Sequence, residues 1–164
     1  MYDRFNNLFE KEFVGYRFIN GEIVPITDEV EIKEINDSLS IPFQGARKHI
    51  EKALHFLSDR TNPDYKNCIK EGISAVESIC QIIVGNNSAT LGTALKKLEN
   101  SGVSIHPALK SSFEKLYGYT SDEGGIRHAE GLFESNVTFD EAKFMTVTSC
   151  AFINYLLANY GKRK

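Results

Sequence analysis

The chain has 164 residues, of which 41% are hydrophobic and 25% are charged, with a formal net charge of −3. This balance is typical of one globular domain with a sizeable core, and the slight acidic excess excludes a broad basic surface for long DNA. No apolar run approaches the roughly 18 residues of a membrane-spanning helix, and the charged, aromatic start MYDRFNNLFEKEF lacks the apolar centre of a signal peptide. We therefore expect a cytoplasmic protein with no membrane partner.

The beginning of the chain predicts a helix followed by a β-hairpin. Apolar residues of 2–13 recur on one side, as in a short amphipathic helix. Asn20-Gly21 separates two β-rich runs, 16–19 and 22–26, and this dipeptide is typical of a type I′ turn, which needs positive φ at both central residues. Because a lone hairpin is only marginally stable in water, we expect this one to pack against a helical core or a partner.

The sequence after the hairpin predicts a series of helices. Thr27 is the expected N-cap of a helix that runs to about Ser38, and further helices are expected at 43–58, 63–84, 90–99, 107–119 and 139–160. The most regular of these is 63–84, in which apolar residues recur every three or four positions. The sequence therefore predicts a mainly α fold, an up-and-down helical bundle with a small N-terminal β-hairpin.

Two of the predicted helices carry recognisable start signals. Asn62-Pro63 is a typical start, because Asn caps a helix and Pro suits the first helical position. Thr138 and Glu141 form a capping box at the start of the last helix.

The cysteines indicate neither disulfides nor a metal site. There are three, none of them is in a CxxC pair, and each falls in an apolar periodic segment: Cys68, Cys80 and Cys150. In a reducing cytoplasm such residues are typically buried thiols. The four histidines have no ligand-like spacing with them, so we expect no metal and no other cofactor.

The densest group of polar functional groups lies in residues 121–130, which read SDEGGIRHAE. Gly124 and Gly125 leave the backbone accessible just before an apparent helical start, where free N–H groups bind anions. Arg127 has a planar guanidinium suited to phosphate oxygens, and His128 can transfer a proton near neutral pH. We therefore predict phosphate binding by the two glycines and Arg127, and RNA cleavage without a metal by Arg127 and His128.

Neighbouring polar side chains complete this predicted site. Asp122 is the third predicted catalytic residue, because its carboxylate can orient the arginine or the histidine; Glu123 and Ser121 are supporting residues. Glu77 lies near the edge of the buried face of the helix 63–84. A carboxylate there usually needs a cation, and Arg127 is a candidate; exposure of Glu77 to solvent is the alternative.

A structural interpretation stays open beside the catalytic one. In it TSDEGG is a polar loop, Arg127 pairs with a bundle carboxylate and His128 faces solvent. Consecutive helix positions point about 100° apart, so the two side chains share a pocket only where the turn is irregular. The remaining histidines have structural explanations, with His49 and His55 expected on a solvated helix face and His106 in a loop.

Four long segments have a distinctive sequence: GYRFINGEIVPITDEVEI, SDRTNPDYKNCIKEGISAVESIC, ATLGTALKKLE and LYGYTSDEGGIRHAE. Together they resemble the C-terminal domain of bacterial AbiJ-like abortive-infection proteins, which belongs to the HEPN superfamily, from about Phe13 to Tyr160. The resemblance implies a helical bundle that dimerises, with an active site near the dimer interface. We therefore expect an N-terminal extension at 1–26, a HEPN-like bundle at 27–164, and a homodimer.

The resemblance also implies a role in antiviral defence. Many HEPN domains are metal-independent endoribonucleases of phage-defence or toxin–antitoxin systems, and AbiJ-like proteins usually carry another domain before this one. We therefore expect an RNA substrate and a further N-terminal domain outside this chain, with Met1 as an artificial start.

One departure from the family motif leaves the activity open. The HEPN ribonuclease motif is an Arg, four to six residues, and then a His. Arg127 fits the first position, but residues 132–134 are Leu, Phe and Glu. Either His128 takes the role of the usual histidine in a ribonuclease toxin, or the domain is a non-catalytic dimerisation, RNA-binding or sensing module of a larger defence protein.

Overall fold

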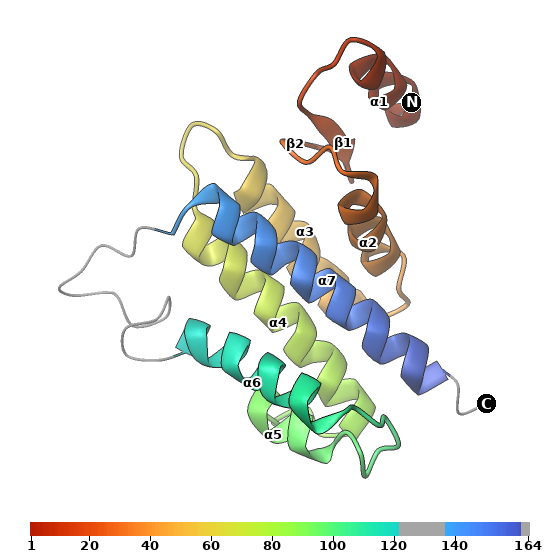
Figure 1. The fold of residues 1–164 in the computed structure, drawn as a ribbon, viewed down its shortest axis with the longest axis vertical. Helices are drawn as coiled ribbons and strands as arrows, with labels where there is room; N and C mark the ends of the chain where they lie inside the picture. Colours follow the sequence, from red (N-terminus) through yellow and green to blue (C-terminus); the bar gives the residue numbers. More distant parts are fainter. Residues whose placement is uncertain (122–136, 162–164) are drawn as a thin grey trace, which may run out of the picture.

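The computed structural model describes residues 1–121 and 137–161. Within these residues the fold is mainly helical, with seven helices and one two-stranded sheet (Figure 1). The elements, in chain order, are α1 (Tyr2–Lys11), β1 (Arg17–Ile19), β2 (Glu22–Val24), α2 (Glu29–Leu39), α3 (Gln44–Ser58), α4 (Tyr65–Val84), α5 (Leu91–Lys97), α6 (Pro107–Ser121) and α7 (Phe139–Gly161). The predicted fold class, a helical protein with a small N-terminal hairpin, is confirmed.

The centre of the molecule is the pair of long helices α4 and α7, which lie side by side (Figure 1). Helix α3 packs against α4, helix α2 packs against α7, and α5 and α6 cover the other side of α4. Fully buried aliphatic side chains from these helices form one core: Ile35, Ile50, Leu54, Ile69, Ile79, Leu95, Ile153 and Leu156. The stripe predicted for 63–84 is the face of α4 that enters this core.

The hairpin forms at the predicted turn. Asn20 and Gly21 both have positive φ, of 49° and 85°, as a type I′ turn requires. The strands pair antiparallel, and the side chains of Ile19 and Val24 are buried in the core. The hairpin is therefore held by the helical bundle, as its low intrinsic stability demands.

Helix α1 packs on the opposite side of the hairpin and buries none of its own residues. The ring of Phe18 lies 5.3 Å from that of Tyr2 and 5.6 Å from that of Phe9, between ring centroids. The Asn6 side chain accepts a hydrogen bond from the Phe18 amide (2.7 Å) and donates one to the Phe18 carbonyl (2.9 Å). Helix α1 is thus attached through one strand.

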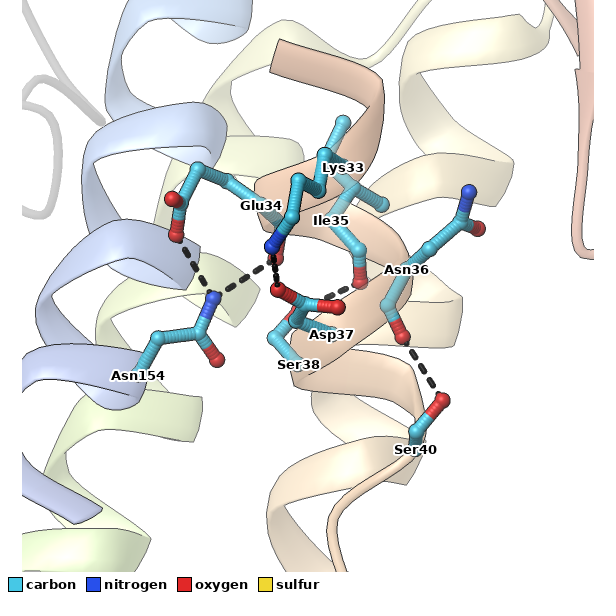
Figure 2. A network of polar contacts seen from close by, with 8 residues as sticks. All are labelled: Lys33, Glu34, Ile35, Asn36, Asp37, Ser38, Ser40 and Asn154. Carbon is cyan, nitrogen blue, oxygen red and sulfur yellow. Dashed lines mark hydrogen bonds and ion pairs between the residues drawn. The ribbon is translucent and has the colours of Figure 1, made fainter. Parts of the chain in front are cut away.

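Polar contacts join α2 to α7 (Figure 2). The Asn154 side-chain amide on α7 donates to the Glu34 carbonyl at 2.9 Å and to the Glu34 carboxylate at 2.7 Å (Figure 2). Nearby, Lys143 Nζ lies 2.7 Å from Glu31 Oε2. The face of α2 that carries the Lys33–Asp37 ion pair is exposed.

Two predicted helix caps are wrong by one or two residues. The side chain of Asp28, and not that of Thr27, accepts hydrogen bonds from the first amides of α2. Likewise Asp64, and not Asn62, caps α4 by accepting from the Asn67 amide at 3.0 Å. In both cases a carboxylate lies within reach, and the positive N-terminal end of the helix dipole favours its negative charge.

Candidate functional site

The centre of the predicted site lies outside the described residues, which omit 122–136. The assignments for six residues therefore stay predictions: Asp122, Glu123, Gly124, Gly125, Arg127 and His128. The structure describes the two helix ends that this segment connects and the predicted supporting residue Glu77; Ser121 is the last residue of α6.

A hydrogen bond joins the two helix ends that the segment 122–136 connects. The Tyr119 hydroxyl, near the end of α6, donates to Glu141 Oε1 in the first turn of α7, at 3.1 Å. The other oxygen of Glu141 accepts from the Thr138 amide at 2.9 Å, which confirms the predicted capping box. These donors, first the Thr138 amide and then the Tyr119 hydroxyl, lower the pKa of Glu141. Burial and the nearby carboxylate raise the pKa of Tyr119.

Glu77 has a structural partner among the described residues. It projects from α4, is half-buried, and its Oε1 accepts the Leu91 amide at 2.9 Å. Leu91 is the first residue of α5, so the carboxylate satisfies a free amide where the helix dipole favours negative charge. Support of Arg127 by Glu77 stays a prediction.

The histidines differ from expectation in one case. His49 was expected on a solvated face, but its Nδ1 pairs with the Glu71 carboxylate on α4, and its side chain is only 35% exposed. His106 lies in a loop as expected, and its Nδ1 accepts the Ala108 amide at 3.2 Å. His55 is exposed, as predicted, yet it faces a carboxylate from the hairpin. The partners of His49 and His55 lie 22 and 33 positions away in the sequence and leave no local signal.

A cavity of about 650 Å³ lies between the N-terminal segment and the end of α3. Its apolar lining comes from the N-terminal segment and comprises Phe9, Val14, Tyr16 and Ile23. Its polar lining comes mainly from the end of α3, which contributes His55, Ser58, Asp59 and Arg60. Glu22 of the hairpin adds one carboxylate. No local sequence signal indicates this group, because Glu22 lies 33 positions before His55 and 36 positions before Ser58.

The carboxylates of this cavity are engaged by protein donors. Glu22 accepts from Ser58 Oγ at 2.7 Å with one oxygen and lies 3.2 Å from His55 Nδ1 with the other. Asp59 Oδ1 accepts the amides of Thr61 and Asn62, two and three residues further along the turn, at 2.9 Å each. Those amides lower the pKa of Asp59.

The cationic side chain of the cavity is engaged differently. The guanidinium carbon of Arg60 lies 3.9 Å from the centroid of the Tyr16 ring, within the range of a cation–π interaction. Arg60 forms no ion pair with a carboxylate in residues 1–121 or 137–161. The free N–H groups of the guanidinium are therefore available to a ligand.

The three cysteines are buried and reduced, as predicted. Burial raises the pKa of Cys68 to about 11, and the pKa values of Cys80 and Cys150 to about 12. In the described part of the chain, His, Cys, Asp and Glu side chains form no group of three that could hold a metal ion. No helix of that part has both the length and the apolar character to cross a membrane.

Comparison with known proteins relates the N-terminal part of the chain to a family. Residues 1–40 match the family model of AbiJ N-terminal domain 4, whereas comparisons with curated proteins and with solved structures found no match. The matched segment ends with α2 and contains GYRFINGEIVPITDEVEI, so assigning that sequence to a C-terminal domain is wrong. It also crosses the predicted boundary between residues 26 and 27. The match links this chain to AbiJ-like abortive-infection proteins.

Proposed function

We propose that this chain is part of a prokaryotic abortive-infection protein and that its bundle is a HEPN-like, metal-independent endoribonuclease. The observation that carries the defence role is the match of residues 1–40 to an AbiJ N-terminal domain. The ribonuclease role is supported by the chemistry of EGGIRH, which lies in the connection between α6 and α7.

The proposed reaction needs a phosphate anchor and a proton carrier. Arg127 binds the scissile phosphate and stabilises the charge that develops on the phosphorane. His128 takes the proton of the 2′-hydroxyl, whose oxygen attacks phosphorus, and passes this proton to the 5′-oxygen as the bond between that oxygen and phosphorus breaks. Asp122 positions the two groups. The products are a 2′,3′-cyclic phosphate and a 5′-hydroxyl end.

The Tyr119–Glu141 hydrogen bond is consistent with this arrangement. It holds the end of α6 beside the start of α7, and these are the two helices that the connection carrying Arg127 and His128 joins. Glu77, on the neighbouring helix α4, is half-buried and close to α5. In this proposal it completes the support of Arg127.

The experiment is an RNA-cleavage assay in EDTA with the wild-type chain, Arg127→Ala and His128→Ala. Loss of the general acid–base residue is expected to lower the rate by ~100- to 10,000-fold, and the arginine variant should lose activity comparably. Arg4→Ala and His106→Asn are matched controls, because both wild-type side chains are exposed and lie on other elements. Equal cleavage by wild type and both site variants would refute the proposed site.

A second function is favoured by a specific feature of the sequence. The histidine that the HEPN motif expects is absent from residues 132–134, so a non-catalytic module that dimerises or binds RNA is the alternative. Sedimentation analysis with and without a labelled RNA tests it. A dimer that binds RNA and does not cleave it in the assay above would favour this alternative over the ribonuclease.

A further inference from the structure

The cavity between the N-terminal segment and α3 has free hydrogen-bond donors and few free acceptors. Both oxygens of Glu22 are engaged by Ser58 and His55. The guanidinium of Arg60 lies over the Tyr16 ring and forms no ion pair within residues 1–121 and 137–161. Because Glu22 faces Nδ1 of His55, the ring nitrogen left for another partner is Nε2. Arg60 and His55 therefore favour a ligand that supplies acceptors.

We propose that this cavity binds a nucleoside phosphate, with the phosphate on Arg60 and His55 and the base against Ile23 and the neighbouring apolar wall. The volume of about 650 Å³ lies within the range of small-molecule sites, which combine an apolar lining with a few placed polar groups. An arginine fork matches phosphate oxygens. The exposed side chain of Ile23 gives the base an apolar surface to cover.

The position of the two donors at the end of α3 suits this role. His55 lies in the last turn of the helix and Arg60 follows Asp59, the C-cap. The free carbonyls of a helix C-terminus favour positive charge nearby, which suits the guanidinium of Arg60. A cationic ligand, in contrast, would meet carboxylates that already accept protein donors.

The ligand would contact both parts of the chain. Tyr16, Glu22 and Ile23 belong to the segment that matches the AbiJ N-terminal domain, whereas His55 and Arg60 lie beyond it. Binding would therefore stabilise the attachment of the N-terminal segment to the bundle. This inference does not depend on the ribonuclease proposal, since it uses none of the residues of that site.

Calorimetric titration of the full chain with AMP tests the proposal. Wild type should bind, and Arg60→Gln should weaken binding about tenfold or more, since a hydrogen bond to a charged group is lost. His55→Gln should also weaken the binding of AMP. Adenosine, which lacks the phosphate, should bind to wild type as weakly as AMP binds to Arg60→Gln. Lys48→Gln, which removes an exposed charge from the same helix, should bind AMP as wild type does.

A free nucleotide and an RNA end share this chemistry, and a short oligoadenylate distinguishes them. If the oligoadenylate binds tenfold more tightly than AMP and is weakened equally by Arg60→Gln, the ligand is RNA; equal affinity indicates a free nucleotide. The proposal is wrong if AMP does not bind at millimolar concentration, if Arg60→Gln binds like wild type, or if adenosine binds as tightly as AMP. The proposal is also wrong if AMP changes the amide chemical shifts of other residues and leaves those of Tyr16, Ile23 and His55 unchanged.

Discussion

Replacing Gly72 with alanine tests how closely the central helices α4 and α7 approach. A Cβ atom at Gly72 would lie 3.2 Å from Ser149 Oγ, 3.6 Å from Ser149 Cβ and 3.9 Å from the Met145 carbonyl oxygen. Gly72 is buried and Ser149 is 4% exposed. The first of these distances is shorter than an ordinary van der Waals contact, so either Ser149 or a helix must move.

Two opposing effects decide the stability of this variant. Overpacking a well-packed core typically costs ~1–3 kcal/mol, whereas alanine in place of glycine inside a helix is favourable by ~1 kcal/mol. We expect the packing effect to win by about 1 kcal/mol, because Ser149 is enclosed in the core. For a domain of this size the melting temperature should fall by about 2–4 °C.

Urea unfolding followed by circular dichroism measures the change, with two reference variants. Gly92→Ala is the matched control, since a Cβ there meets nothing within 4 Å; it should gain up to ~1 kcal/mol from helix propensity. In Gly72→Ala/Ser149→Ala the close oxygen is gone, so the two changes should show a coupling above ~0.5 kcal/mol. If Gly72→Ala alone stabilises the protein as Gly92→Ala does, α4 and α7 do not approach this closely.

Three further predictions concern other parts of the molecule. Glu77→Ala should lower the free energy of unfolding by about 1–3 kcal/mol by leaving the Leu91 amide without its acceptor, and hydrogen exchange in α5 should rise; Glu77→Gln should recover part of the loss, and unchanged exchange would contradict the contact. The pKa of Glu141 in the folded state is below its ordinary 4.5, so its contribution is present above pH 4.5 and is lost as the pH falls through the folded pKa. The stability difference between wild type and Glu141→Gln should therefore shrink in acid, and a pH-independent difference would refute this. The three buried thiols, with pKa values raised to about 11 or 12, should react with DTNB at pH 8 only after unfolding in urea; rapid labelling of the folded chain would show that they are accessible.

Local signals predicted local structure well. The Asn20-Gly21 turn and the Thr138–Glu141 capping box formed where the sequence placed them, because each depends on residues within four positions. The apolar periodicity of 63–84 predicted which face of α4 is buried. Capping signals placed the starts of α2 and α4 only to within one or two residues, because neighbouring polar side chains compete for the same amides and Asp28 and Asp64 are the caps.

Contacts between distant segments could not be predicted in this way. The sequence left open whether Glu77 has a partner or faces solvent, and only the structure places the Leu91 amide beside it. The sequence predicts that His55 lies on a solvated helix face, and only the structure shows that the hairpin places Glu22 next to it. No periodicity or motif encodes a contact across 33 positions, so the cavity had no signature in the sequence.

From the sequence alone one obtains a helical bundle, a hairpin, three buried thiols and a polar segment suited to phosphate chemistry, because propensity, capping and apolar spacing act over a few residues. The tertiary structure decided which helices pair, that α1 is attached through Phe18, and that Glu22, His55 and Arg60 line one cavity. These depend on the packing of side chains from distant segments, where shape and the satisfaction of buried polar groups select one arrangement.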